Sequence, residues 1–231
     1  MPQKPRKVAI FDIDGTIFRS SLLIEITDGL IQEGVFPAKA RKQYQNAYQA
    51  WLERKDSYDK YIDAVVEVFL RYLKGIRHKD FSAVVKKVVA FHQDRVYRYT
   101  RDLIRSLKQR GYFLLAISNS PKEILDEFCR RYGFDKVYGR LYEIGPNGAY
   151  TGEIIYLDMI SDKAKILQRA LEKENLTLKN SIGVGDTESD IAFLKLVDRP
   201  ICFNPNLKLY QRAKKFGWEI VVERKDVVYI K

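Results

Sequence analysis

The residues with the clearest chemical potential are two carboxylates at the end of an apolar run near the N-terminus. Residues 8–16 read VAIFDIDGT, so Asp12 and Asp14 end a pattern typical of a buried strand. An acid at the tip of a core strand is costly to bury unless a cation or a proton offsets its charge. An ionised aspartate can attack phosphorus, and a second carboxyl group can protonate the leaving alkoxide. We therefore expect Asp12 to act as a nucleophile and Asp14 as a general acid and base.

Gly15 and Thr16 complete this segment and suit the same chemistry. Glycine lets the chain turn away from the strand, and the hydroxyl of Thr16 can hydrogen-bond near a phosphate. Proton transfer also requires the site to raise the pKa of Asp14, so that the carboxyl is protonated during part of the cycle. Taken alone, these residues also fit an Asx-type turn after a strand.

A second acidic segment follows a predicted strand at 181–185. Its first carboxylate, Asp186, can hold one hard cation together with Asp12. Mg²⁺ fits because it prefers one or two carboxylates plus phosphate and water. The backbone carbonyl of Asp14 is a further candidate metal ligand. Asp190 lies four residues after Asp186 and can bind a metal-bound water or orient a cationic side chain.

Phosphate-binding groups are expected at the end of another strand. Ser118 and Asn119 follow an apolar run at 112–117 and precede a predicted helix that begins near Pro121. A hydroxyl and free amides at a helix N-terminus suit a phosphate group. Ser120 fits a plain N-cap equally well, so this motif alone leaves both interpretations open.

Lys163 is the candidate cation for the phosphoryl group. It lies at the start of a predicted helix at 162–175, where a positive charge opposes the helix dipole and is easier to understand if it points at an anion. Lys165 competes with it from a different face of the helix. Considered singly, either lysine also fits an ordinary solvated position.

Strand and helix patterns alternate over most of the chain, which is typical of an α/β fold with a doubly wound, mainly parallel sheet. Ligands of such sheets bind beyond the carboxyl ends of the strands, at the topological switch point. Asp12, Ser118 and Asp186 each lie at such an end, so we expect them to converge on one crevice. Apolar runs predict strands at 7–12, 112–117, 181–185, 200–203 and 219–222, and the PNG sequence at 146–148 predicts a hairpin turn.

Residues 20–97 show only helical patterns and predict an insertion into this fold. We expect a core formed by residues 1–19 and 98–231 and a helical cap formed by residues 20–97. Asp80 or Ser82 is the expected N-cap of the last cap helix. Three aromatic residues of the second helix are interpreted as a packing face and two histidines as structural or surface residues: Tyr44, Tyr48 and Trp51, and His78 and His92.

These segments, in this order, resemble the motifs of the haloacid dehalogenase superfamily, and within it the phosphoserine-phosphatase-like branch, subfamily IB. The motifs are DIDGT at 12–16, SNS at 118–120, Lys163, and GDTESD at 185–190. The resemblance implies a Rossmann-like core with a helical cap, a Mg²⁺ cofactor and hydrolysis of a phosphomonoester through an aspartyl-phosphate. It implies Asp12 as nucleophile, Asp14 as general acid and base, Ser118 and Lys163 as phosphoryl ligands, and Asp190 as a support for Lys163 and the metal shell.

One position departs from the phosphoserine phosphatases of this family, which carry a glutamate shortly after the first motif that holds the substrate amino group. Here the corresponding residues are RSS at 19–21, and Glu25 follows about one helical turn later. A counterpart of their cap arginine is not evident. We therefore expect a small phosphorylated metabolite, without favouring phosphoserine, in a site closed by the cap. Phosphoryl transfer to an alcohol uses the same intermediate and is a second interpretation.

Composition bears on the remaining alternatives. The 231 residues carry a formal net charge of +11, which also fits a nucleic-acid-binding or nucleic-acid end-processing protein. The basic residues are spread along the chain without a recognition motif, and a closed cap obstructs a polymer, so nucleic acid is disfavoured as a partner. No apolar run reaches roughly 18 residues and no signal segment is evident, which predicts no membrane association and a cytoplasmic protein. The two cysteines, Cys129 and Cys202, lack disulfide or zinc spacing.

Overall fold

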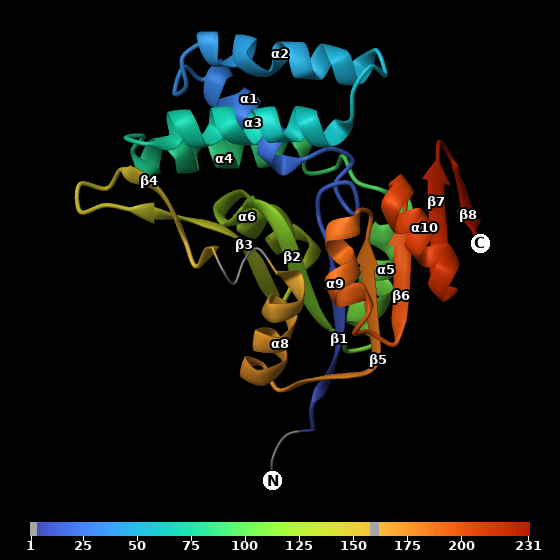
Figure 1. The fold of residues 1–231 in the computed structure, drawn as a ribbon. Coiled ribbons are helices and arrows are strands. Elements are labelled where there is room, and N and C mark those ends of the chain that lie inside the picture. The colour runs from blue at the N-terminus through green and yellow to red at the C-terminus, as the bar shows by residue number, and fades with distance from the viewer. Residues whose placement is uncertain (1–3, 158–161) are drawn as a thin grey trace.

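A computed structural model describes residues 4–157 and 162–231 of the chain. Its sheet contains β1 (Arg6–Phe11), β2 (Phe113–Pro121), β3 (Lys136–Ile144), β4 (Tyr150–Ile155), β5 (Leu176–Gly185), β6 (Arg199–Phe203), β7 (Glu219–Arg224) and β8 (Val227–Ile230). The spatial order is β4-β3-β2-β1-β5-β6-β7-β8 (Figure 1). All neighbours from β3 to β7 pair in parallel, and only the two edge pairs, β3 with β4 and β7 with β8, are antiparallel. The expected α/β class with a mainly parallel sheet is confirmed.

The switch point of this sheet lies between β1 and β5. From β1 the chain builds β2 and β3 on one side, and it then returns to build β5, β6 and β7 on the other side. Connections therefore leave β1 and β5 in opposite directions, which opens a crevice beyond their carboxyl ends. The acidic segments that follow these two strands meet there.

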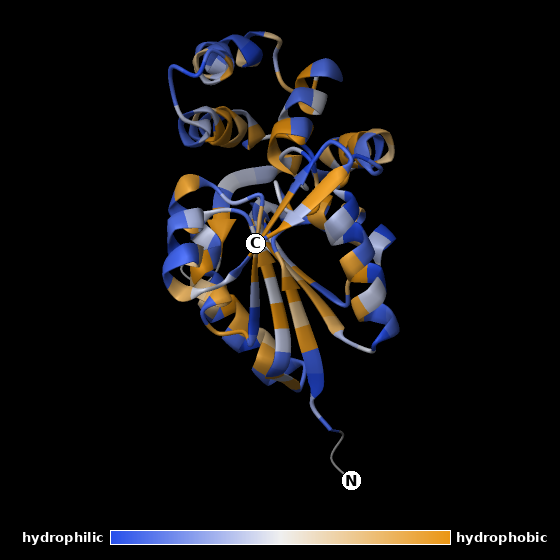
Figure 2. Ribbon diagram, turned by 90° about the vertical axis from the view of Figure 1, so that its right-hand side faces the viewer, coloured by the Kyte–Doolittle hydropathy of each residue, from blue (hydrophilic) through white to orange (hydrophobic). Residues whose placement is uncertain are grey.

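Helices cover both faces of the sheet because alternate strand residues point to opposite faces. On one face, Ala9 and Phe11 share a buried cluster with residues of α5 (Arg98–Gln109) and α6 (Lys122–Tyr132). On the other face, Val8 and Ile10 pack with residues of α8 (Lys163–Lys173), α9 (Ile191–Leu194) and α10 (Leu207–Phe216). Figure 2 shows the largely hydrophobic strands enclosed between these helices.

Four helices inserted between β1 and α5 lie over the carboxyl ends of the strands (Figure 1). They are α1 (Leu22–Gln32), α2 (Lys39–Leu52), α3 (Tyr58–Leu73) and α4 (His78–His92). Their apolar side chains join the same buried cluster as α5 and α6, so the inserted helices have no separate core. The cap boundaries at residues 20 and 97 remain a prediction. None of the described helices combines the length and hydrophobicity needed to cross a bilayer.

Two local features of the structure differ from what the sequence predicted. α4 begins at His78, so Asp80 and Ser82 lie inside the helix, and the expected N-cap is wrong. The reason is tertiary, because the N–H of His78 donates to the carbonyl of Gly148 in the β3–β4 turn at 2.9 Å. The strand β8 was not predicted, because it is a short, mostly exposed edge strand with no buried face to mark it.

Candidate active site

The polar side chains singled out in the sequence meet at the carboxyl end of the sheet. Asp12 follows β1, Ser118 and Asn119 lie near the end of β2, and Asp186 follows β5. The three strands are neighbours in the order β2-β1-β5, which brings their ends together. Lys163, the first residue of α8, reaches the same place from one face of the sheet.

Lys163 is a buried cation held between two buried carboxylates. Its Nζ donates to Oδ1 of Asp12 at 2.6 Å and to Oδ1 of Asp190 at 2.5 Å. Asp162 caps α8 by accepting the N–H of Ala164 at 2.9 Å, which fixes the helix start that carries the lysine. Burial lowers the pKa of Lys163, but the two carboxylates outweigh it and the net pKa is raised, so the amine stays charged. Lys165 is exposed, and the structure therefore distinguishes the two lysines.

Asp190 anchors this arrangement from the one-turn helix η1 (Glu188–Asp190). Its Oδ2 accepts the backbone N–H groups of Asp186 and Thr187, each at 3.0 Å, while its Oδ1 accepts Lys163. A Cβ at Gly185 would lie 2.5 Å from Asp190, so this close packing requires glycine. Asp190 thus orients the lysine and holds the loop that carries Asp186.

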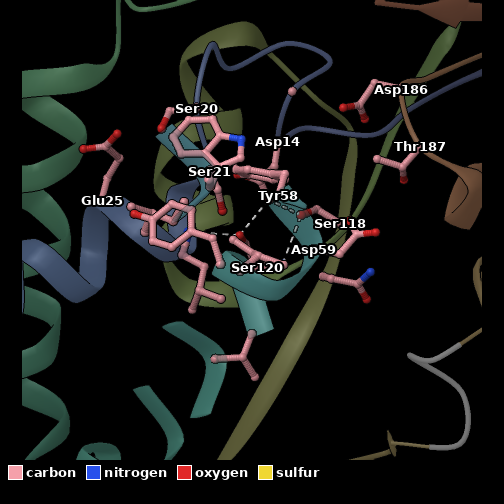
Figure 3. A pocket seen from close by; sticks show the side chains of 18 of the residues that line it. Asp14, Ser20, Ser21, Glu25, Tyr58, Asp59, Ser118, Ser120, Asp186 and Thr187 are labelled. Atoms are coloured by element: carbon pink, nitrogen blue, oxygen red, sulfur yellow. Dashed lines mark hydrogen bonds between the residues drawn. The ribbon is translucent and has the colours of Figure 1, made fainter. Parts of the chain in front are cut away.

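Asp14 is held by three donors on the cavity side of the site. Its Oδ2 accepts the hydroxyls of Ser118 at 2.9 Å and Ser120 at 2.6 Å (Figure 3). Its Oδ1 accepts the N–H of Leu22 at 2.6 Å. Burial raises the pKa of Asp14, and these hydrogen bonds oppose the rise without cancelling it. A raised pKa favours the protonated form of the carboxyl group, which is the form that a proton donor needs.

Ser120 is a site residue that sequence reasoning did not assign to the chemistry. β2 runs through Pro121, which takes the N-cap position of α6, so the N-cap interpretation of Ser120 is wrong. Its hydroxyl donates to Asp14 and accepts the N–H of Leu23 at 3.1 Å. Residues two apart in a strand share a face, so the spacing of Ser118 and Ser120 was the available signal.

Thr16 and Gly15 lie against Asp186. The hydroxyl of Thr16 is fully buried and donates to Oδ1 of Asp186 at 3.1 Å, where the sequence predicted a phosphate as its partner. Gly15 has a φ of +78°, and a Cβ there would lie 2.1 Å from Oδ2 of Asp186. Only glycine permits this approach. Asn119, by contrast, is exposed and lines the cavity.

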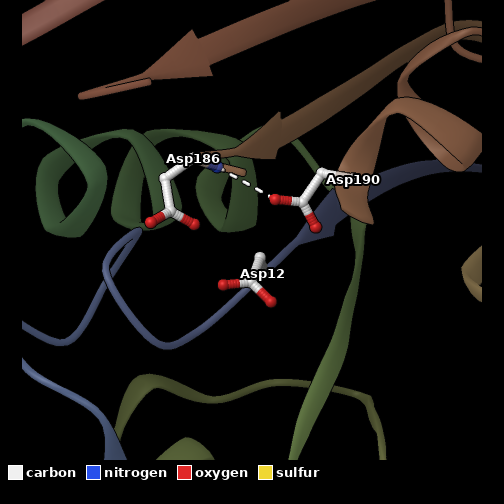
Figure 4. Close-up of side chains that lie close together, drawn as sticks. All are labelled: Asp12, Asp186 and Asp190. Atoms are coloured by element: carbon white, nitrogen blue, oxygen red, sulfur yellow. Dashed lines mark hydrogen bonds between the residues drawn. The ribbon is translucent and has the colours of Figure 1, made fainter. Parts of the chain in front are cut away.

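The donor set fits a divalent cation. Carboxylate oxygens of Asp12, Asp186 and Asp190 lie within 4.8 Å of one another (Figure 4). Burial raises the pKa of Asp12 against the opposing charge of Lys163, and burial together with the neighbouring carboxylates raises that of Asp186. A hard cation with oxygen ligands would offset this excess of negative charge. Because both oxygens of Asp190 are engaged, Asp12 and Asp186 are the better candidates for ligands.

A cavity of about 910 Å³ lies next to these residues and is also lined by residues of α1, α2 and α3. Glu25 of α1 lines it, but its two oxygens are engaged by Arg95 at 2.9 Å and by His92 at 3.1 Å. His78 likewise pairs with Glu123 at 3.1 Å. Both histidines therefore support side chains of the fold, as expected.

Comparison with known proteins assigns this arrangement to a family. A family model described as haloacid dehalogenase-like hydrolase matches residues 9–195, which include Asp12, Ser118, Lys163 and Asp190. The chain belongs to this family. The expected resemblance is confirmed, and the similarity to named phosphatases identifies the chain as a phosphatase.

The relatives cover almost the whole chain. A histidinol-phosphatase of Neisseria meningitidis is 24% identical, and the alignment covers 94% of this chain and 98% of that protein. A phosphoserine phosphatase of Methanocaldococcus jannaschii is 22% identical, with 97% of this chain and 96% of the relative covered. Both names describe a phosphatase, but they specify different substrates.

Solved structures show the same fold. A Bordetella pertussis protein of unknown function superimposes with a TM-score of 0.75 at 20% identity, over 94% of this chain and 98% of that protein. A phosphoserine phosphatase with a phospho-aspartyl intermediate analogue gives a TM-score of 0.63 at 20% identity, with 96% of each chain covered. The Rossmann-like architecture expected from the sequence is thereby confirmed.

Proposed function

We propose that the protein is a Mg²⁺-dependent phosphomonoester hydrolase that forms a phosphoryl ester on Asp12 and acts on a small phosphorylated metabolite. The observation that carries this proposal is the contact of Lys163 with both Asp12 and Asp190, which places a fixed positive charge beside the nucleophile. An ammonium group in this position neutralises charge on the transferred phosphoryl group.

The first chemical step is an in-line attack of an Asp12 carboxylate oxygen on phosphorus, with cleavage of the bond to the alkoxide. Asp14, held by Ser118 and Ser120, donates its proton to the leaving oxygen. In the second step Asp14 takes a proton from a water that attacks the same phosphorus, and the bond to Asp12 breaks. Inorganic phosphate then leaves the site, and the carboxylate of Asp12 is regenerated.

Other residues hold the groups that react. Ser118, Asn119 and Lys163 are the proposed phosphoryl ligands, and Thr16 positions Asp186. Asp12, Asp186 and the backbone carbonyl of Asp14 would hold Mg²⁺. When bound, the ion supplies positive charge that offsets the charge of the phosphoryl oxygens.

Phosphoserine is not the favoured substrate. The carboxylate of Glu25 is engaged by Arg95 and His92, and Arg41 lies 3.9 Å from Asp28. The carboxylate of Glu25 is therefore not free to hold the amino group of an amino acid. The cytoplasm is the proposed location, in agreement with two buried, unbridged cysteines, Cys129 and Cys202.

The test measures Mg²⁺-dependent phosphate release from p-nitrophenyl phosphate and a panel of metabolite phosphomonoesters. Asp12→Asn should abolish release, whereas Asp63→Asn, the same change at an exposed residue of α3, should not alter it. Alcohols added to the assay detect phosphoryl transfer through the new ester they form. Unchanged turnover in Asp12→Asn would exclude the proposed nucleophile.

A further inference from the structure

Five aromatic side chains form one wall of the cavity, here called the aromatic wall. They come from two helices of the insertion: Tyr44, Tyr48 and Trp51 from α2, and Tyr58 and Tyr61 from α3. The sequence predicted a packing face for the α2 residues, and Tyr44 is indeed buried. Tyr48 and Tyr58, however, keep 37% and 39% of their surface exposed. The wall therefore presents ring surface to the cavity.

Contacts among the rings hold this wall in place. Trp51 stacks on Tyr61 with centroids 5.6 Å apart and an interplanar angle of 15°, and Tyr48 contacts Tyr61 at 5.2 Å. Tyr58 meets the edge of Trp51 at 5.4 Å. Rings fixed by one another lose little conformational freedom when a flat ligand group binds.

The aromatic wall lies next to the reacting groups. Tyr58 lines the same cavity as Asp14 and Asp186. Figure 3 shows Tyr58 in the same pocket as Asp14 and Ser118. A phosphoester bound at Asp12 would thus extend its alcohol part past Asp14 toward the wall.

Two carboxylates that line the upper cavity are engaged by other side chains of the protein. Glu25 is engaged by Arg95 and His92, and Asp28 accepts the hydroxyl of Tyr44 and lies 3.9 Å from Arg41. A cavity of about 910 Å³ also lies near the upper end of the usual range for small-molecule sites. Ring surface is therefore available for recognition there, beside other charged side chains that line the cavity: Arg19, Asp59 and Arg140.

We propose that the alcohol part of the substrate carries an aromatic or heteroaromatic ring that stacks on the aromatic wall. This inference rests on the proposed phosphomonoester hydrolysis and narrows its substrate class. Offset stacking and edge contacts between rings stabilise a complex beyond the effect of buried area, and a saturated ring of similar size lacks that contribution.

The test compares benzyl phosphate with cyclohexylmethyl phosphate. Both release a primary alcohol of similar size, so the chemical step is closely matched and the ring is the main difference. We expect kcat/KM to be about 3- to 10-fold higher for the benzyl ester. Tyr48→Leu and Tyr58→Leu should bring this ratio close to one. Phe91→Leu is the matched control, because Phe91 is 84% exposed and does not line the cavity.

Two results would overturn this inference alone. Equal kcat/KM for the two esters in the wild type, with p-nitrophenyl phosphate hydrolysed normally, would contradict the substrate class and leave the hydrolase proposal intact. The substrate class would also be contradicted if the ratio of kcat/KM for the benzyl and cyclohexylmethyl esters stayed the same in both Tyr48→Leu and Tyr58→Leu. Failure to hydrolyse any of the three esters in the presence of Mg²⁺ would overturn the proposed function and this inference together.

Discussion

At the carboxyl end of the sheet, Asp12, Asp14 and Asp190 accept hydrogen bonds from fixed donors, whereas the aromatic wall on α2 and α3 is held mainly by ring contacts. The first region lies where β1, β2 and β5 end, and it gives at least one oxygen of each of these carboxylates a hydrogen-bond partner. The second belongs to the inserted helices and presents surface rather than single atoms. Hydrogen bonds and charges are sensitive to position, while ring surfaces accept many ligand shapes. The difference agrees with the proposals that the reaction takes place at the sheet and that the inserted helices select the substrate.

The largest contrast between the regions should come from Asp12→Asn. Loss of the nucleophile should lower kcat by about 10⁴-fold or more, because the remaining groups cannot form the covalent ester. Folding should be retained, since Lys163 keeps its contact with Asp190. Steady-state phosphate release and thermal unfolding measure the two effects. Tyr48→Leu, assayed in parallel, should lose far less activity.

Metal removal should affect the sheet region alone. Chelation should reduce phosphate release to background, and Mg²⁺ should restore it, because Asp12 and Asp186 are the proposed oxygen ligands. Bound Mg²⁺ should also raise the unfolding temperature, by linkage of binding to the native state. Asp186→Asn should weaken both responses. Full activity in excess chelator would contradict the metal site.

Asp14→Asn should separate the two chemical steps. Without a proton donor, kcat for an alkyl phosphate should fall by about 10²- to 10⁴-fold. The formation of the phosphorylated enzyme from p-nitrophenyl phosphate should fall much less, because p-nitrophenolate leaves without protonation. An equal loss of this first step for both leaving groups would exclude Asp14 as the general acid. Single-turnover release of each alcohol provides the comparison.

Lys163→Met should have the largest effect on stability. It leaves the buried carboxylates of Asp12 and Asp190 without their cation, at a cost of about 3–5 kcal/mol in the free energy of unfolding. Lys165→Met is the matched control at an exposed position and should change stability by no more than about 0.5 kcal/mol. Urea unfolding at pH 7 measures both variants.

The loss in Lys163→Met should depend on pH. In the wild type the charge of Lys163 lowers the pKa of Asp12, so its removal raises that pKa further in the folded state. A carboxyl with a raised pKa in the folded state binds its proton more tightly there than in the unfolded state. The variant should therefore lose stability as the pH rises and approach the wild type in acid. A deficit that grows in acid would contradict this account of the charge cluster.

Much of the sheet region could be predicted from the sequence because its signals are local. Apolar runs mark β1, β2 and β5. Each of these runs is followed directly by a polar residue of the site, which is Asp12, Ser118 or Asp186. Parallel pairing then brings these ends together. The helix start made Lys163 a candidate cation, but it left Lys165 as a competitor, and the family resemblance decided between them.

The rest depends on tertiary contacts. Ser120 fits an N-cap by local rules, and only the extension of β2 through Pro121 turns it toward Asp14. The helical period identified the apolar face of α2 but not which rings of that face border a cavity. The start of α4 likewise depends on Gly148, which is distant in the sequence.

The covalent role of Asp12 can be observed directly in the Asp14→Asn variant, rapidly mixed with p-nitrophenyl phosphate and Mg²⁺. Attack by Asp12 should still release p-nitrophenolate, whereas hydrolysis of the ester should be slow without a base. We predict a burst of p-nitrophenolate equal to the enzyme concentration, and hydroxylamine should then trap the acyl phosphate at Asp12 in the peptide map. The combined Asp12→Asn and Asp14→Asn variant should show neither signal. A burst that persists in the combined variant, or an adduct at another residue, would contradict the covalent role of Asp12.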